Sequence, residues 1–290
     1  MLNVHEFIHS PEFAVLPDAL SKILELYNPA DTDIKTVSDI IETDENLSVK
    51  LLRVVNLPVF ALGTEVKTLN QTIEILGKDR FLNIVVGVSI FSNFYTSENK
   101  AVNSILEDFW WHSSCVGMIA KSIIKKTNKS FDENEFIGGL LHDIGKLALI
   151  EYDVEKYFEV IRLVEEEKYQ DIEAENYIFS TDHTIVGEEI AKLWKLPEQL
   201  SDIINFHNNL NDLTRNQELV ASVRIADMIS EIWGAGFHEG IRALKLKDEP
   251  GWKYLLESFP NLSDLDIELF TFGLESDFKK TVDFIKVIKS

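Results

Sequence analysis

Cysteine is nearly absent from this chain, in which Cys115 is the single thiol among 290 residues. One cysteine cannot form an internal disulfide, so the hydrophobic core has to hold the fold together. The first residues also lack the basic segment and apolar stretch that make a signal peptide. These absences predict a protein of the reducing cytoplasm.

Basic residues are scarce. The chain has 28 Lys and Arg against 49 Asp and Glu, which gives a formal net charge of −21. Because a strongly acidic surface repels the phosphate backbone, we expect neither a DNA nor an RNA partner. Four lysines gather between Lys121 and Lys129, but acidic residues follow at once, from Asp132 to Glu135. This order is typical of a solvated helix end.

Long apolar runs are missing as well. The longest extends from Phe81 to Tyr95, and it is interrupted by Asn83 and Asn93. It is shorter than the ~20 apolar residues that a membrane-spanning helix needs. The sequence therefore predicts a buried helix here and no membrane partner.

Strand-type alternation is not found in any window, whereas helical periodicity is found throughout, so we predict an all-α fold. One apolar stripe runs from Leu20 to Tyr27 and another from Leu47 to Val55. Thr68 and Gln71 have the capping-box pattern at the start of a short helix, and Gly77 stands where that helix would end.

A polar segment at 96–102 indicates a seam in the chain. We predict an N-terminal helical subdomain over residues 1–96, a second helical domain over 97–234, and C-terminal helices over 235–290. The last helix is expected from about Leu262 to Ile288.

Several ionisable residues fall on apolar helix faces of the second domain. They are His112, Asp143, His183, His207 and Asp227, and His142 is the neighbour of Asp143. A single buried histidine is most often a satisfied core residue, but one such group on each of several helices needs a common explanation. Imidazoles and carboxylates together suit divalent transition ions, and a carboxylate can bridge two of them. We therefore predict a metal centre with these six residues as ligands.

Four of these residues resemble the motif of the HD superfamily of metal-dependent phosphohydrolases, which has a histidine, an adjacent His-Asp pair and a distant aspartate. Here the matching residues are His112, His142, Asp143 and Asp227. The resemblance implies a multi-helix HD-type bundle and one or two divalent ions, chosen from Fe, Mn, Ni, Zn and Mg.

A longer resemblance, over roughly residues 14–230, is to the HDOD family of HD-related output domains in bacterial signalling proteins. It rests on short segments along the chain, namely Leu16-Pro17, Ile41-Glu42-Thr43-Asp44, Leu51-Leu52-Arg53-Val54-Val55-Asn56, Ile75-Leu76-Gly77, Trp111-His112-Ser113 and the glycine-flanked His142-Asp143. Since many members are regulatory, this resemblance implies a signalling protein that acts through a protein partner. The N-terminal subdomain is the expected docking surface.

His183, His207 and Lys146 are similar to residues of the HD-GYP phosphodiesterases. The two histidines would be ligands of a second ion, with Asp143 as the bridge between ions, and Lys146 would contact a substrate phosphate. The alternative for Lys146 is a lysine at a helix C-terminus that caps carbonyls. The chain departs from these enzymes because no Gly-Tyr-Pro motif follows His207 and residue 208 is Asn.

Two functions from different classes remain. The first, which we favour, is a regulatory signalling module that keeps an HD-type metal site. The second is a metal-dependent phosphohydrolase or phosphodiesterase acting on a nucleotide, in which Asp143 and Lys146 would be the catalytic residues and a nucleotide or phosphate the ligand.

Overall fold

A computed structural model describes residues 3–11, 13, 16–27, 33–95, 97, 99–243, 245–264 and 267–289. Over these residues the regular structure is helical throughout and contains no strand, so the predicted all-α class is confirmed. No helix among them is long and apolar enough to cross a membrane.

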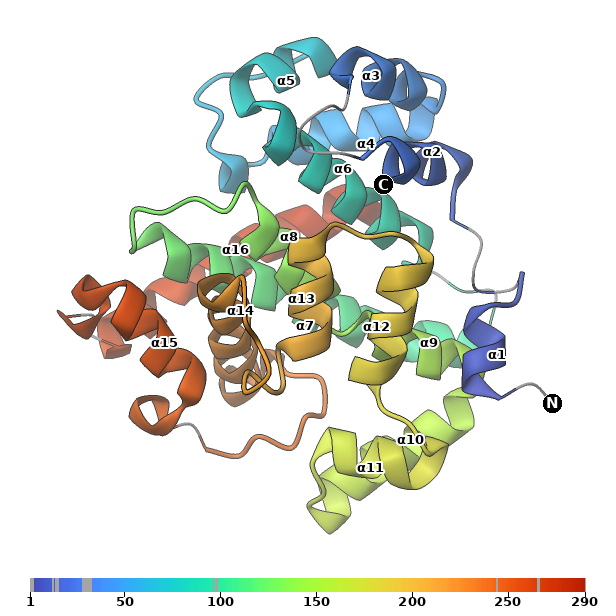
Figure 1. Cartoon of the computed structure of the whole chain (residues 1–290), viewed down its shortest axis with the longest axis vertical. Helices are drawn as coiled ribbons and strands as arrows, with labels where there is room; N and C mark the ends of the chain where they lie inside the picture. Colours follow the sequence, from blue (N-terminus) through green and yellow to red (C-terminus); the bar gives the residue numbers. More distant parts are fainter. Residues whose placement is uncertain are drawn as a thin grey trace.

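The first elements of the chain are α1 (Val4–Ile8), α2 (Asp18–Leu26), α3 (Ile34–Glu42), α4 (Glu45–Val55), the 3-10 turn η1 (Pro58–Phe60), α5 (Leu69–Leu76) and α6 (Lys78–Asn93). Helices α2–α5 are short and lie together at one end of the molecule (Figure 1). Helices α2 and α4 follow the two predicted stripes, and α6 is the predicted buried helix. α1 lies apart from the others, beside α9 and α12.

Thr68 caps α5 as predicted, because its hydroxyl accepts a hydrogen bond from the Gln71 N–H. The other half of the capping box is shifted by one residue, since Gln71 Oε1 accepts from the N–H of Lys67. Gly77 ends α5 with a φ of 81° and also begins α6. The left-handed backbone lets two helices follow each other without a linker.

The longer helices follow. They are α7 (Lys100–Lys125), α8 (Asn134–Leu141), α9 (Ile144–Tyr152), α10 (Val154–Glu167), α11 (Asp171–Phe179), α12 (His183–Leu193), α13 (Glu198–Phe206), α14 (Gln217–Ser230) and the π-helical turn η2 (Glu231–Ala235). Helix α7 packs against α8, α14 and α16, so it forms the centre of the bundle. α10 and α11 form a pair at the end opposite α2–α5 (Figure 1).

The chain ends with η3 (Leu246–Asp248), α15 (Pro250–Ser258), η4 (Pro260–Asp264) and α16 (Ile267–Lys289). The last helix begins later than predicted because Pro260 opens a separate 3-10 turn. α16 packs against α7 and also against α4 and α6, so the last helix contacts helices from the first third of the chain (Figure 1).

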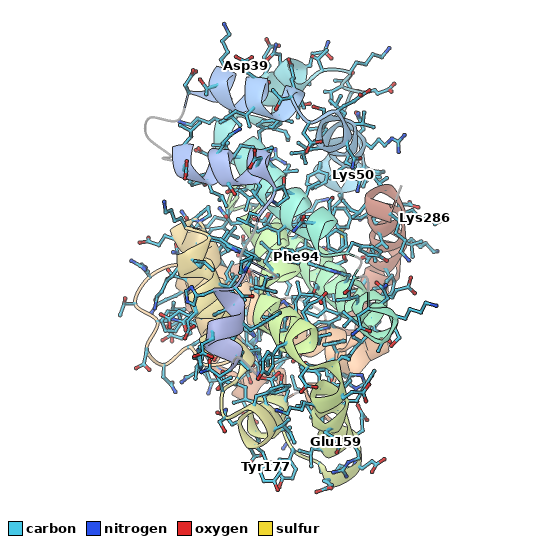
Figure 2. The ribbon with its side chains drawn as sticks, turned by 90° about the vertical axis from the view of Figure 1, so that its right-hand side faces the viewer. Asp39, Lys50, Phe94, Glu159, Tyr177 and Lys286 are labelled. Carbon is cyan, nitrogen blue, oxygen red and sulfur yellow. The ribbon has the colours of Figure 1, made fainter. Side chains whose placement is uncertain are left out.

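The main hydrophobic core extends from Val4 to Ile288, and a small separate cluster lies between α10 and α11. Phe94 illustrates how the main core joins distant segments, because its ring stacks 5.4 Å from that of Trp194 on the other side of the proposed seam. Charged side chains such as Asp39, Glu159 and Lys286 extend from the surface instead (Figure 2). The division at residue 96 stays a prediction.

Two close contacts made by glycines set the spacing of the helices that carry the buried ionisable residues. A Cβ on Gly139 of α8 would lie 2.6 Å from the Cα of Gly117 in α7, and a Cβ on Gly145 of α9 would lie 2.0 Å from the carbonyl oxygen of His183 in α12. A Cβ on the neighbouring Gly138 would lie 2.1 Å from Cδ1 of Ile203 in α13. The backbones that carry the site residues therefore approach more closely than side chains would allow.

Candidate metal centre

His112 lies in the middle of α7 and is completely buried. Its Nδ1 is 2.9 Å from the carbonyl oxygen of Ala235, in the π-helical turn η2. A carbonyl can only accept, so this contact places the ring proton on Nδ1 and leaves the Nε2 lone pair free. Nε2 faces the side chains of Asp227 and Glu239, at 3.4 and 3.2 Å from their nearest oxygens.

The pair His142 and Asp143 occupies the junction between α8 and α9. His142 Nδ1 is 2.8 Å from the carbonyl oxygen of Gly139, so its Nε2 also points into the centre with a free lone pair. That nitrogen is 3.5 Å from Asp143 Oδ2 and 3.7 Å from Asp227 Oδ1. The break between the two helices allows adjacent residues to face the same point.

Asp143 faces two groups of histidines, one with each oxygen. Oδ2 is 3.5 Å from His142 Nε2 and 3.9 Å from His112 Nε2. Oδ1 is 3.5 Å from His183 Nε2 and 3.3 Å from His207 Nε2. The four predicted histidine ligands thus come together around this carboxylate, and the predicted ligand Asp227 faces two of them, His112 and His142.

His183 and His207 come from the first residue of α12 and the C-terminal cap of α13. Glu175 accepts hydrogen bonds from His183, from Nδ1 at 2.7 Å and from the backbone N–H at 2.8 Å. His207 Nδ1 lies 3.1 Å from the carbonyl oxygens of Ile203 and Ile204. Each ring therefore turns Nε2 towards Asp143, in the manner of metal-binding histidines whose far nitrogen is held by a carboxylate or carbonyl.

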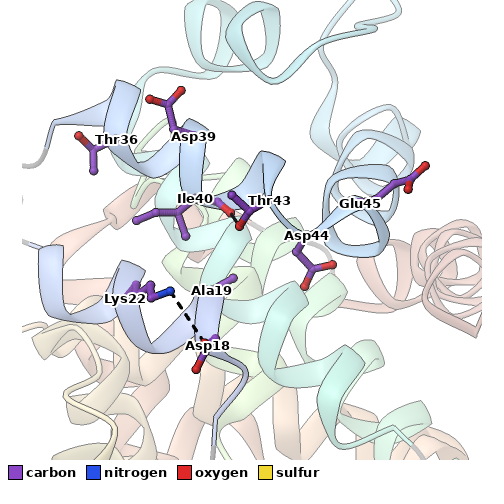
Figure 3. Close-up of a pocket in the computed structure, with 9 residues that line it drawn as sticks. All are labelled: Asp18, Ala19, Lys22, Thr36, Asp39, Ile40, Thr43, Asp44 and Glu45. Atoms are coloured by element: carbon purple, nitrogen blue, oxygen red, sulfur yellow. Dashed lines mark hydrogen bonds and ion pairs between the residues drawn. The ribbon is translucent and has the colours of Figure 1, made fainter.

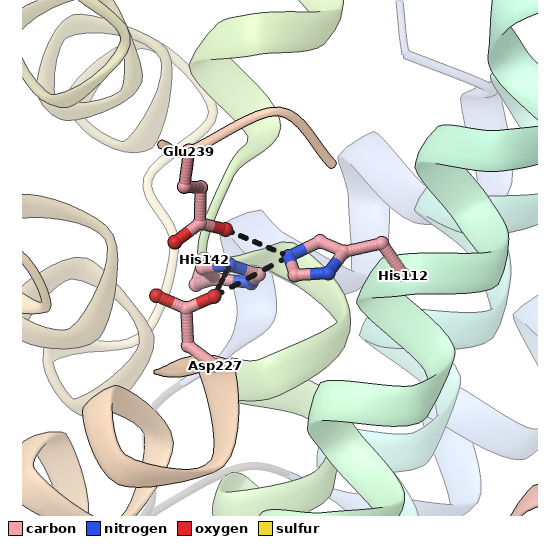
Figure 4. Close-up of side chains that lie close together, drawn as sticks. All are labelled: His112, His142, Asp227 and Glu239. Atoms are coloured by element: carbon pink, nitrogen blue, oxygen red, sulfur yellow. Dashed lines mark ion pairs between the residues drawn. The ribbon is translucent and has the colours of Figure 1, made fainter. Parts of the chain in front are cut away.

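Glu239 is a member of the centre that the sequence did not predict. It follows η2 in an irregular segment and is 4% exposed. Its carboxylate completes a group with His112, His142 and Asp227 whose ligand atoms all lie within 4.8 Å of one another (Figure 4). No helical periodicity runs through residue 239, so the pattern used for the other ligands could not find it.

Lys146 is also buried, and its ammonium group is 2.7 Å from Asp143 Oδ2 and 2.9 Å from Asp171 Oδ2. It lies in the first turn of α9 and not at a helix C-terminus, so the carbonyl-capping alternative is wrong. Asp171 and Glu175 were not predicted either. They lie four residues apart on the buried face of α11 with Ala174, a signal of the same kind as that of the histidines.

Burial disfavours charge on every carboxylate of the centre, yet their pKa values diverge. Electrostatic interactions with His142 and Lys146 overcome burial and hold the pKa of Asp143 well below its usual range. Interactions with the neighbouring histidines do the same for the pKa of Asp227. For Glu239, burial and repulsion from Asp227 both raise the pKa well above its usual value. Asp227 and Glu239 thus compete for positive charge.

The two histidines on the other side of Asp143 also differ. Burial, with repulsion from His142, lowers the pKa of His207 to about 4, so this ring is neutral. Burial acts in the same direction on His183, but the charge of Glu175 outweighs it and raises the pKa of His183 to about 9.

The chemistry of the donors fits a divalent cation. His112 Nε2, His142 Nε2, Asp227 Oδ1 and Glu239 Oε1 are buried and have no hydrogen-bond partner in the described part of the chain. Buried polar atoms without partners are costly, and in their unprotonated forms two imidazole lone pairs and two carboxylate oxygens are all acceptors that cannot satisfy one another. A cation at their centre would satisfy all four, so this buried His/Asp/Glu cluster could bind a metal.

A profile of the HDOD domain matches residues 13–210. The chain belongs to the HDOD family. The match agrees with the predicted start near residue 14 and ends earlier than predicted, so Asp227 and Glu239 lie beyond it. An uncharacterised protein of Treponema pallidum is 22% identical over 218 residues, which are 73% of this chain and 42% of that protein. The present chain thus covers less than half the length of that relative.

Solved structures share the fold over nearly the whole chain. An HDOD domain protein of unknown function from Geobacter sulfurreducens is 26% identical, with a TM-score of 0.77 over 98% of this chain and 96% of its own. A protein from Shewanella amazonensis, named as a candidate phosphohydrolase, is 20% identical, with a TM-score of 0.70 over 98% and 97% of the two chains. The shared fold therefore extends over the C-terminal helices.

Proposed function

We propose that this protein is a regulatory HDOD module of bacterial signal transduction and that its buried centre holds a divalent metal ion. The observation that carries the proposal is a group of four metal-ligand atoms without hydrogen-bond partners in the described part of the chain, which lie within 4.8 Å of one another and come from His112, His142, Asp227 and Glu239. Beside them lies Asp143, whose two oxygens face different pairs of histidines. Imidazole and carboxylate ligands suit Fe, Mn, Ni and Zn, while Mg favours oxygen ligands alone.

A bound ion would link distant parts of the sequence. Its ligands come from α7, the α8–α9 junction, α14 and the segment after η2. The ion would supply the positive charge that the carboxylates lack, and the chain would hold it with imidazole nitrogens that the carbonyls of Ala235 and Gly139 orient. Occupancy would therefore change the stability of the whole helical bundle.

A regulatory role is favoured because the centre is closed. All the proposed ligands are at most 4% exposed, and Lys146 already contacts Asp143 and Asp171. Catalytic metal sites keep a position open for water or substrate, whereas structural sites are surrounded by protein. A substrate phosphate would have to displace one of these carboxylates to reach Lys146.

Metal content and thermal unfolding test the proposal. Protein freed of metal should bind one of Mn, Fe, Ni, Zn or Mg, and at an ion concentration of 100 Kd its free energy of unfolding should rise by about 2.7 kcal/mol. Asp227→Asn should lose this stabilisation, while Asp212→Asn, at an exposed position, should keep it. Absence of binding and of stabilisation for all five ions would reject the metal centre.

The alternative is a metal-dependent phosphohydrolase or phosphodiesterase that acts on a nucleotide. It is supported by Asp143, whose two oxygens face two groups of histidines as in a two-ion centre. Hydrolysis of a nucleotide phosphodiester with added Mn or Fe separates the two functions. We expect no turnover above that of Asp143→Asn. Turnover that is lost in Asp143→Asn and kept in Asp212→Asn would establish the enzyme instead.

We further propose a protein partner that contacts the N-terminal helices. A surface pocket lies between α2 and α3 and extends to the start of α4 (Figure 3). It is lined by carboxylates that include Asp18, Asp39 and Asp44, which favour a basic partner segment. Asp39→Lys should weaken signalling in the cell, and Glu159→Lys at the opposite end should not. Equal effects of both changes would argue against this surface.

A further inference from the structure

His183, His207 and Asp143 form the second half of the centre, and by ligand count alone they could hold a second ion. Asp143 Oδ1 lies 3.5 Å from His183 Nε2 and 3.3 Å from His207 Nε2. The hydrogen bonds of this half, however, differ from those of the first half, which consists of His112, His142, Asp227 and Glu239.

Asn208 donates to both histidines. Its amide nitrogen Nδ2 is 2.8 Å from His183 Nε2 and 3.1 Å from His207 Nε2. Glu175 and the Ile203 and Ile204 carbonyls take the Nδ1 protons, so both Nε2 atoms are acceptors in the neutral rings. A charged His183 would carry a proton on Nε2 and would likewise offer no lone pair. A primary amide has two N–H groups, and here each has its own acceptor. The lone pairs that a second ion would need are therefore already occupied.

Arg224 determines which way the amide of Asn208 points. Its Nη1 donates to Asn208 Oδ1 at 2.8 Å and lies 3.2 Å from Asp227 Oδ2. Arginine has only donors, so rotating the amide to offer its oxygen to an ion would place an N–H group against another N–H group. The pKa of Arg224 is itself raised, since nearby carboxylates including Asp227 outweigh its burial, and the charge of this side chain repels a further cation.

The buried atoms without hydrogen bonds show the same asymmetry. His112 Nε2 and His142 Nε2 have no partner in the described part of the chain, whereas the corresponding atoms of His183 and His207 do. Asp143 Oδ1 also lacks a donor, and it is a single oxygen on the side where both imidazoles are already bonded. A cation is therefore needed only on the side of Asp143 that faces His112 and His142.

We propose that Asn208, held by Arg224, closes the His183/His207 side and limits the centre to one ion, bound by His112, His142, Asp143, Asp227 and Glu239. The inference rests on the proposed metal site and assigns its stoichiometry. His183 and His207 then line the side of Asp143 that faces away from the ion and bind no metal themselves.

An isosteric substitution tests this directly. Asn208→Asp replaces the donating nitrogen with a ligand oxygen of the same shape, and Asn209→Asp makes the same charge change at the exposed neighbouring position. Titration with Mn²⁺ and elemental analysis should give one ion per chain for the parent and for Asn209→Asp, and two for Asn208→Asp. Two ions in the parent, or one ion in a folded Asn208→Asp, would overturn the inference.

A second pair of variants does not depend on residue 208. His207→Gln should retain one ion per chain, and His112→Gln should retain none. Loss of the ion in a folded His207→Gln would place the ion on the other side and overturn the inference. A parent that binds no ion at all would overturn the proposed function, so the two failures can be told apart.

Discussion

Asp143 and Lys146 form a buried ion pair at 2.7 Å, and both side chains are at most 1% exposed. Breaking such a pair leaves a buried charge without compensation. In metal-free protein, Asp143→Asn should lower the free energy of unfolding by about 3 kcal/mol. Urea unfolding measures this, with Asp212→Asn as the control at an exposed site.

A double-mutant cycle separates this pair from the rest of the network. Lys146→Met in the Asp143→Asn background should cost less than it does alone, by about 1–3 kcal/mol. Additive costs would mean that Lys146 is balanced by Asp171, 2.9 Å away, and not by Asp143.

Glu135 predicts a pH dependence of stability away from the centre. Burial and the charge of Glu133 raise its pKa to about 7 in the folded protein, from 4.5. Folding therefore favours the protonated acid. This contribution is complete below pH 4.5 and is lost as the pH rises through about 7, with a total of about 3 kcal/mol.

The difference between the parent and Glu135→Gln isolates this effect from all other titrations. Between pH 5 and pH 8, the free energy of unfolding should fall more in the parent than in Glu135→Gln. Glu74→Gln, which removes a carboxylate from an exposed position, should follow the parent. Parallel pH profiles for parent and Glu135→Gln would contradict the prediction.

The helices that carry the centre depend on close backbone contact. Gly145 in α9 faces the carbonyl oxygen of His183 in α12, which a Cβ would approach to 2.0 Å. Since a backbone oxygen cannot turn away, Gly145→Ala should separate the two helices and lower the free energy of unfolding by about 2–3 kcal/mol. It should also weaken metal binding, because Asp143 precedes Gly145 by two residues.

A glycine elsewhere provides the matched control. Gly273 lies within α16, and a Cβ there would meet nothing within 4 Å. Gly273→Ala should raise the free energy of unfolding by about 0.5–1 kcal/mol through helix propensity. Equal effects of the two substitutions, measured by urea unfolding, would mean that α9 and α12 tolerate wider spacing.

The continuous core predicts one cooperative unfolding transition for the whole molecule. The chain offers a direct test, because all five tryptophans follow residue 96 while helices α2–α6 precede it. Helix content measured by far-UV circular dichroism and tryptophan fluorescence should therefore change together on heating. Loss of helix before any change in fluorescence would show that the N-terminal helices unfold by themselves, as separate subdomains would.

Much of the fold and six residues of the centre follow from helical periodicity. Ionisable side chains in the apolar stripes of α7, α12, α13 and α14 had to face the core, because residues three and four positions apart share one side of a helix. Asp143 was predicted in the same way, and His142 as its neighbour. The capping pattern at Thr68 was likewise a local feature that a single segment reveals.

Other features depend on distant segments that only the folded chain brings together. Glu239 lies in an irregular segment with no period to indicate its direction, and Lys146 meets Asp171 across two helices. The closure of one half of the centre requires Asn208 to meet His183, 25 residues away in sequence, and Arg224, 16 residues away. Periodicity determines that a side chain is buried. The partner that satisfies it, and hence whether its lone pair is free for a metal, is decided by tertiary packing.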